Sequence, residues 1–248
     1  MNIIAIIPAR YASTRLPGKP LVDVCGKPMI QRVYEQVIKS ALITDVIIAT
    51  DDERIAAAVK SFGGNAQMTP VDIQSGSDRI ALVAKNLQAD IVVNVQGDEP
   101  LIDPQLIDQT IQALIDDPNT VVSTAVKRTV LPQDVFNPSV VKVALDKNNH
   151  ALYFSRSPIP HIRDAKKDSE WFNGTVFYKH FGLYVYRADF LQRYTTLAQT
   201  PLEKAEKLEQ LRILEHGYNI KCLLTEYESF PVDTPEDLQK VVEHLKIN

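Results

Sequence analysis

The fold is decided by the stretch IVVNVQGDEP, residues 91–100. Residues 91–95 form an almost continuously apolar, β-branched run, which is typical of a strand buried on both faces of a parallel sheet. An acidic turn follows at once and places Asp98 just beyond the end of that strand. Because ligands of open α/β sheets bind outside the carboxyl ends of the strands, the stretch predicts both the core of the fold and one edge of a site.

The alternation of apolar runs and helical patterns extends to both sides of this strand. The sequence predicts strands over residues 2–7 and 45–50, and helices over residues 28–42, 52–62, 77–87 and 104–115. Strands that alternate with helices in this way are joined by crossover connections and form a parallel sheet.

The pattern changes near residue 120. The sequence predicts strands over residues 121–127, 140–145 and 151–155, with a hairpin at 147–150, an irregular arm over 158–178 and a strand over 179–187. A helix over residues 202–216, a strand over 220–225 and a helix from 234 complete the chain. The strand 179–187 alternates, with Phe181, Leu183 and Val185 on an apolar face and His180, Gly182, Tyr184 and Tyr186 on a polar one. We therefore expect an α/β fold with a mostly parallel central sheet flanked by helices and a smaller antiparallel excursion over about residues 120–185.

Composition limits the partners and the location. The 248 residues carry 27 Lys and Arg against 31 Asp and Glu, a formal charge of −4, so no global positive field exists to attract nucleic acid or a membrane surface. No linker rich in Gly or Ser separates domains, and residues 1–248 are expected to form a single domain. The first apolar run, residues 3–7, is far shorter than the roughly 20 residues of a membrane span, and we expect a cytoplasmic protein.

The loop after the first strand concentrates positive charge. It carries Arg10, Arg15 and Lys19 at the edge of the sheet where a polyphosphate would sit. The loop is not a P-loop, because Ser13 stands where the first glycine of GxxxxGK[ST] belongs and Pro20 replaces the hydroxyl residue. A solvated basic loop is the alternative interpretation.

Two carboxylates are candidates for holding a hard cation. Mg²⁺ takes one or two protein carboxylates and fills its other positions with water and phosphate oxygens, a role that fits Asp98. Asp233, just before the final helix, is the second candidate. The structural alternatives are a turn acid for Asp98 and a helix-flanking acid for Asp233.

Further polar residues are candidates for a pocket wall. Residues 74–79 (QSGSDR) carry groups that suit a base edge or a sugar, but taken alone the segment favours a plain helix cap. His180 indicates a pocket wall or a structural histidine. Glu209 falls between Ala205 and Ile213 on the predicted helix and so needs a partner, either substrate hydroxyls or a structural arginine.

The absent motifs narrow the chemistry. The sequence has no HExxH, no CxxC and no GxSxG motif, and its five histidines do not cluster, which argues against a zinc site or a nucleophile elbow. What remains is a basic loop, metal-type carboxylates and a polar pocket without a nucleophile. This set suits phosphoryl or nucleotidyl transfer, in which positioning and charge neutralisation supply most of the catalysis.

Taken together, these motifs resemble the 3-deoxy-manno-octulosonate cytidylyltransferases, or CMP-Kdo synthetases. The resemblance runs from about residue 2 to 245 and rests on residues 7–21 (IPARYASTRLPGKPL), 94–100 (NVQGDEP), 153–156 (YFSR), 208–212 (LEQLR) and 232–238 (VDTPEDL). It implies a nucleotide-sugar transferase fold, a homodimer, Mg²⁺ as cofactor and the reaction of CTP with Kdo to give CMP-Kdo and pyrophosphate. In the family this reaction activates Kdo for lipopolysaccharide synthesis in Gram-negative bacteria.

The resemblance also implies a role for each matching residue. Arg10, Arg15 and Lys19 would hold the triphosphate and act with Asp98 in catalysis, and Asp98 and Asp233 would bind Mg²⁺. The residues around the nucleoside would be Gln74, Ser75, Gly76 and Arg79. The residues facing the Kdo carboxylate and hydroxyls would be Gln96, Arg156, His180, Tyr184, Glu209 and Gln210. The region of about residues 120–185 is the expected site of dimer contact and sugar binding.

Two other hypotheses stay open on the sequence alone. The first is a cytidylyltransferase for another 2-keto sugar acid, such as sialic acid or 8-amino-Kdo, because one hydroxyl-to-amine change requires few substitutions in a pocket. The second is a nucleotide-binding module that keeps the fold without turnover, because a fold does not fix a function.

Overall fold

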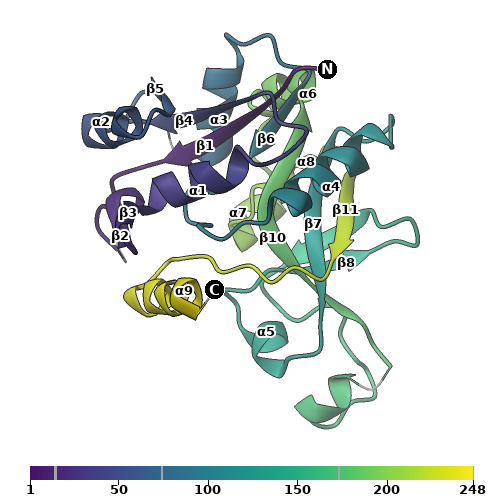
Figure 1. Ribbon diagram of the computed structural model, residues 1–248. Coiled ribbons are helices and arrows are strands. Elements are labelled where there is room, and N and C mark those ends of the chain that lie inside the picture. The colour runs from purple at the N-terminus through teal and green to yellow at the C-terminus, as the bar shows by residue number, and fades with distance from the viewer. Residues whose placement is uncertain (14–15, 74, 173, 248) are drawn as a thin grey trace.

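The structure is a computed structural model that describes residues 1–13, 16–73, 75–172 and 174–247. Over these residues the chain forms a sheet of nine strands with helices on both faces (Figure 1). The main path of the sheet runs in the order β11 (Ile220–Thr225), β7 (Val122–Thr129), β10 (Phe177–Arg187), β6 (Ile91–Asn94), β1 (Ile3–Ala9), β4 (Asp45–Thr50) and β5 (Asn65–Met68). Along this path β10 is antiparallel to both neighbours and the other pairs are parallel, which confirms the predicted mostly parallel α/β sheet.

Both faces of the central strand β6 are buried, as its sequence predicts. Ile91 and Val93 pack into one hydrophobic cluster and Val92 into another on the opposite face. The first cluster lies under helices α1 (Met29–Val37), α2 (Glu53–Ser61) and α4 (Pro104–Ile115). The second lies under α3 (Gly76–Ala84), α6 (Ala188–Tyr194) and α8 (Gln210–Glu215), with α7 (Pro201–Glu206) packed beside α8.

The antiparallel part of the chain grows out of the main sheet. Strands β8 (Lys142–Leu145) and β9 (Ala151–Ser155) form the predicted hairpin, and β8 also pairs with the start of β10. Helix α5 (Pro132–Phe136) and the short 3₁₀ helix η2 (Asp168–Phe172) belong to a projection below the main body, in which α5 lies nearer that body (Figure 1).

A third, smaller core joins the two ends of the chain. The hairpin of β2 (Asp23–Val24) and β3 (Lys27–Pro28) follows a 3₁₀ turn, η1 (Lys19–Leu21), and α9 (Pro235–Ile247) packs on it. Buried Val24, Met29, Val232 and Val241 form this contact, which brings the segment before α9 next to the N-terminal loop. No helix among the described residues is long and apolar enough to cross a membrane.

The single helix predicted over residues 202–216 is wrong. The chain turns between α7 and α8, where Lys207 adopts a left-handed φ of 51°. The two short helices are held together by a buried ion pair, with Arg212 Nε 2.9 Å from Glu203 Oε2. Periodicity does not reveal this turn because a tertiary contact fixes it, and Glu209 therefore stands at the start of α8 and not in mid-helix.

The predicted faces of β10 are confirmed in part. Phe181, Leu183 and Val185 pack into the first hydrophobic cluster, as expected. On the opposite face Tyr186 is only 2% exposed, because the second layer of helices covers it, whereas Tyr178, His180, Gly182 and Tyr184 are half-buried.

Candidate active site

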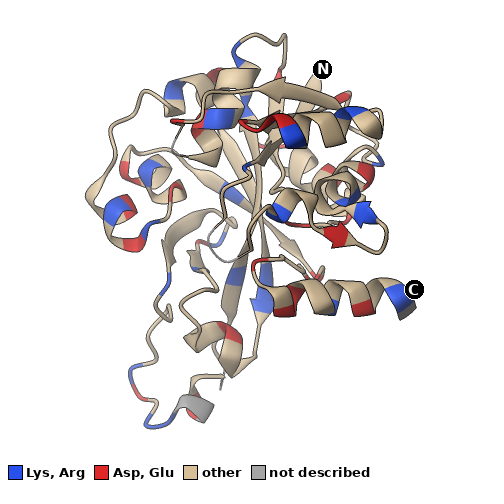
Figure 2. Ribbon diagram, turned by 90° about the vertical axis from the view of Figure 1, so that its left-hand side faces the viewer, with Lys and Arg blue, Asp and Glu red and all other residues tan. Residues whose placement is uncertain are grey.

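The candidate site lies where several strands end. Strands β1, β6, β7 and β11 run in one direction, so the segments that follow them meet at one edge of the sheet. The segment after β11 crosses that edge toward α9, as the yellow trace in Figure 1 shows. Figure 2 shows Lys and Arg intermixed with Asp and Glu over the main body and α9, so the binding of an anion depends on local arrangement.

Lys19 lies between the two candidate metal carboxylates. Its Nζ is 2.6 Å from Asp98 Oδ2 and 3.0 Å from Asp233 Oδ1. Burial alone would lower the pKa of Lys19, but Asp98 and Asp233 outweigh that effect and raise it above its ordinary value. The three residues come from the loops after β1 and β6 and from the segment before α9, so the fold itself brings these charges together.

Close packing of the loop after β6 against the end of β1 fixes the position of Asp98. Gly97 precedes it, and a Cβ at Gly97 would lie 2.8 Å from Pro8 O, closer than real Cβ atoms approach. Only a glycine lets the loop after β6 lie directly against the backbone at the end of strand β1. Lys19 is likewise presented by a glycine, since Gly18 takes a left-handed φ of 66° at the start of η1.

Arg10, Lys19, Gln96, Asp98 and Asp233 line one cavity of about 340 Å³. The guanidinium of Arg10 donates to the Ile73 carbonyl. Burial, together with the nearby Arg79, lowers the pKa of Arg10 from its usual value. Four charged groups predicted from three separate motifs therefore face one space.

A second cavity, of about 580 Å³, adjoins the first at Gln96 and Asp98. Gln96, His180, Tyr184 and Gln210 are among its lining residues. Burial lowers the pKa of His180 to about 3, so its imidazole is neutral near pH 7. Of the predicted sugar-binding residues, these four share one cavity.

The imidazole of His180 is oriented by Thr124. Thr124 Oγ1 donates its proton to Leu183 O at 2.7 Å and is 3.0 Å from His180 Nε2. The Thr124 hydroxyl has only one proton, so toward His180 it acts as the acceptor and Nε2 carries the ring proton. Nδ1 of the neutral ring is then left as an acceptor.

The predicted nucleoside residues that the structure describes lie beside the first cavity and do not line it. Ser75 caps α3, with its Oγ accepting from Asp78 N at 2.9 Å. Gly76 packs against Pro8, which does line that cavity. Arg79 is fully buried and pairs with Asp51 at 2.7 Å.

Two predicted sugar-binding residues lie outside both cavities. Glu209 Oε2 accepts from Ser77 Oγ at 2.7 Å, and burial raises the pKa of this carboxyl. The guanidinium of Arg156 donates to backbone carbonyls of Pro138, Glu206 and Lys207 at 3.1, 2.8 and 3.4 Å. Arg156 therefore links the segments just before Ser139 and Leu208, two residues that line the second cavity.

Two further predicted residues, Arg15 and Gln74, lie outside the described residues.

Sequence reasoning missed several groups at the second cavity. Glu99 and Ser229 line it, and Glu99 is only 9% exposed with its pKa raised by burial to about 7. Lys179 also lines it and pairs with Asp134 at 3.2 Å and with Glu228. Glu99 stands next to Asp98 in the stretch 91–100, but the sequence gives no signal for its hydrogen-bond partner Ser229, which lies on the distant segment before α9.

The donor set fits a hard divalent cation. Asp98 and Asp233 approach the same cation, the Lys19 ammonium, so one positive charge can contact both carboxylates. Two carboxylates beside a space for phosphate and water match the way proteins hold Mg²⁺. In the described part of the chain no group of three or more His, Cys, Asp and Glu side chains is arranged to hold a metal.

Comparisons with known proteins agree in sequence and in structure. A family model described as cytidylyltransferase matches residues 4–222. The chain is 55% identical to the 3-deoxy-manno-octulosonate cytidylyltransferase of Geotalea uraniireducens (strain Rf4), over 99% of this chain and 100% of that protein. It is 54% identical to the enzyme of the same name from Geobacter metallireducens, over 99% of this chain and 98% of that protein. The solved structure of CMP:2-keto-3-deoxy-manno-octonic acid synthetase complexed with CTP has a TM-score of 0.93 and 44% identity, covering 100% of this chain and 99% of that one.

Proposed function

The chain belongs to the 3-deoxy-manno-octulosonate cytidylyltransferase family, and we propose that it transfers CMP from CTP to the anomeric hydroxyl of Kdo, giving CMP-Kdo and pyrophosphate. The observation that carries the proposal is the convergence of Arg10, Lys19, Asp98 and Asp233 on one cavity that opens into a second, polar cavity. A triphosphate and a sugar acid need two such adjoining spaces, because the reacting atoms must meet between them.

In this proposal Asp98 and Asp233 hold Mg²⁺. The cation, when bound, neutralises phosphate charge and lowers the pKa of the attacking hydroxyl. Lys19 leaves the two carboxylates and donates to the phosphates, because its ammonium and a divalent cation compete for the same oxygens.

The reaction is an in-line displacement at the α-phosphorus of CTP. A bond forms between the anomeric oxygen of Kdo and this phosphorus while the bond to the oxygen that bridges the α- and β-phosphates breaks, and the hydroxyl proton passes to solvent. Arg10 and Lys19 stabilise the charge that develops on the departing pyrophosphate. Arg15 is assigned to the same group by its place in the motif.

The second cavity is assigned to Kdo. The acceptor Nδ1 of His180, the Tyr184 hydroxyl and the amides of Gln96 and Gln210 provide hydrogen-bond partners for several hydroxyls. Substrate-induced closure is needed for Arg156 and Glu209 to reach the sugar, since both lie outside this cavity here.

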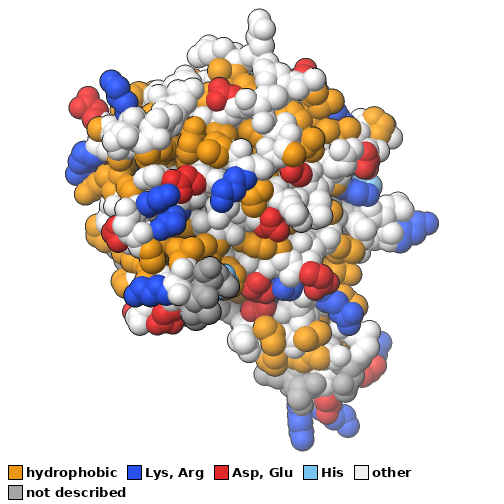
Figure 3. Space-filling view, in the orientation of Figure 1, with side chains coloured by type: hydrophobic (Ala, Val, Ile, Leu, Met, Phe, Trp, Pro, Cys, Tyr) orange, Lys and Arg blue, Asp and Glu red, His pale blue; other side chains and the backbone are white. Residues whose placement is uncertain are grey.

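The setting of the enzyme is part of the proposal. We infer a cytoplasmic homodimer whose product supplies lipopolysaccharide synthesis, with dimer contacts from about residues 120–185. Supporting this contact region, Val130, Leu131 and Leu152 are 54%, 46% and 63% exposed, and Figure 3 shows hydrophobic side chains on the lower projection. Light scattering of the purified protein tests the dimer, and a monomer mass would contradict it.

The test of the activity is pyrophosphate release from CTP and Mg²⁺ with Kdo, 8-amino-Kdo, sialic acid or no sugar, each with and without a chelator. We expect release with Kdo that the chelator abolishes. Preference for another acid would keep the mechanism and change the substrate. CTP binding without release in any mixture would refute the enzyme and favour a binding module.

A further inference from the structure

Two segments that lie far apart in the chain carry the metal-type carboxylates. Asp98 lies on the loop after β6, and Asp233 lies on the segment between β11 and α9. Hydrogen bonds join the segments in antiparallel order: Tyr227 Oη donates to Leu101 O at 2.8 Å, and Val232 N donates to Asp98 O at 2.9 Å. The distance between the two carboxylates therefore depends on how these segments pair.

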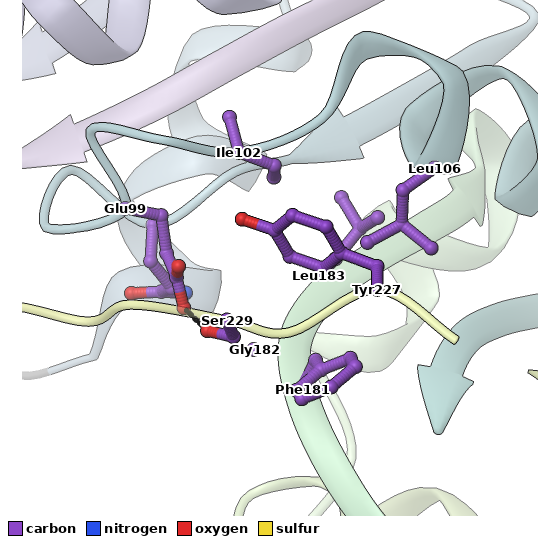
Figure 4. A pocket seen from close by; sticks show the side chains of 9 residues that line it. Glu99, Ile102, Leu106, Phe181, Gly182, Leu183, Tyr227 and Ser229 are labelled. Carbon is purple, nitrogen blue, oxygen red and sulfur yellow. Dashed lines mark hydrogen bonds between the residues drawn. The ribbon is translucent and has the colours of Figure 1, made fainter. Parts of the chain in front are cut away.

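Glu99 forms the side-chain link between them. Its Oε1 accepts from Ser229 Oγ at 2.5 Å across 130 residues of sequence, and its carboxylate also accepts from Phe230 N. Figure 4 shows Glu99 and Ser229 joined by this bond beside the hydrophobic side chains of Phe181 and Tyr227.

Because Glu99 is buried, its bond to Ser229 favours one register between the loop after β6 and the segment before α9. Glu99 is 9% exposed, and a buried carboxylate is costly unless it is hydrogen-bonded. If the segment carrying Ser229 slid by one residue, the carboxylate would lose its hydroxyl donor, because side chains alternate along an extended chain. The bonded register therefore holds Asp233 where it meets Lys19 and Asp98.

We propose that Glu99, acting through Ser229, is the positioning residue that sets the separation of Asp98 and Asp233. This inference rests on the proposed metal-dependent function. Mg²⁺ demands near-ideal octahedral geometry, so a small change in that separation weakens its binding. Residues that orient metal ligands from behind typically contribute about 10- to 100-fold to metal affinity.

The experiment measures Mn²⁺ affinity in the presence of CTP by electron paramagnetic resonance, together with the melting temperature. We expect Glu99→Ala and Ser229→Ala to weaken Mn²⁺ binding about tenfold or more, and Glu99→Gln, whose amide oxygen still accepts, to stay within about threefold of wild type. Ser123→Ala is the matched control, because it removes another buried hydroxyl bond, from Ser123 Oγ to Thr110 O at 2.7 Å, away from the site.

Each outcome decides the proposal. Weaker Mn²⁺ binding in Glu99→Ala or Ser229→Ala, beyond that in Ser123→Ala, supports it. Unchanged Mn²⁺ affinity in both variants overturns it, even if their melting temperatures fall. If Glu99→Ala fails to fold, Ser229→Ala decides alone. Failure of the proposed function is seen separately, as absent pyrophosphate release by the wild type, whereas the Mn²⁺ comparison needs no turnover.

Discussion

Replacement of Gly97 by alanine tests how closely the loop after β6 must pack against the end of β1. The new Cβ would lie 2.8 Å from Pro8 O, whereas an ordinary contact begins at 3.4 Å, so the loop that carries Asp98 must move by about 0.6 Å. The obstacle is backbone, so no side-chain rotation relieves it. Overpacking of this kind costs about 1–3 kcal/mol, and each kcal/mol lowers the melting temperature of a domain of this size by about 2–4 °C.

The larger effect is expected on turnover. A displacement approaching 1 Å in a reacting geometry costs up to about 100-fold, so we expect kcat of Gly97→Ala to fall about 10- to 100-fold. Pyrophosphate release and thermal melting measure both effects. Gly76→Ala is the control for stability, because its Cβ would lie 3.7 Å from Pro8 Cγ, an ordinary contact. Wild-type kcat and melting temperature in Gly97→Ala would refute the argument.

Three further predictions concern charges. Arg212→Ala leaves Glu203 buried without its partner and should lower the free energy of unfolding by about 3–5 kcal/mol in urea titrations; a loss below about 1 kcal/mol would contradict this. The pKa of His180 is about 3 in the folded protein and about 6.5 in the unfolded chain, so the contribution of its neutral form to stability is complete above pH 6.5 and falls by about 2 kcal/mol by pH 5. His180→Asn should reduce this loss of stability between pH 6.5 and pH 5, and an unchanged loss would contradict the prediction. Lys19→Met removes the ammonium that competes with a metal ion for Asp98 and Asp233. In the absence of nucleotide, Mn²⁺ should therefore bind the variant more tightly than the wild type, and weaker binding to the variant would exclude that competition.

The parallel core could be predicted because its signal is local. The apolar runs that become β1, β4 and β6 are long enough to indicate buried strands, and the pattern of α4 matches its observed bounds, Pro104–Ile115. Strand β5, by contrast, is the short and polar run Asn65–Met68 at the end of the sheet, so it carries no hydrophobic pattern and was missed.

The charged part of the site was also accessible from sequence. Lys19 lies in the loop after the first predicted strand, and Asp98 closely follows another. The carboxyl ends of parallel strands share one edge. Asp233 was a weaker prediction because its position depends on the packing of α9 against the β2–β3 hairpin, a contact between the two ends of the chain.

Long-range side-chain pairs could not be predicted from spacing. The bond from Ser229 to Glu99 spans 130 residues, and the pairing of Arg79 with Asp51 turns a predicted nucleoside contact into a buried ion pair in this conformation. The sequence around one partner does not predict the other, because the tertiary arrangement of the loops determines which residues meet.

The most direct test of the account is Asp98→Asn, assayed by ³¹P NMR for conversion of CTP and Kdo with Mg²⁺. The wild type should form CMP-Kdo and pyrophosphate in equal amounts. The variant should form neither, while its melting temperature stays close to that of the wild type, since Asp98 is partly exposed and the substitution keeps its shape. Near wild-type turnover by Asp98→Asn would contradict the central claim that this carboxylate holds the metal for nucleotidyl transfer.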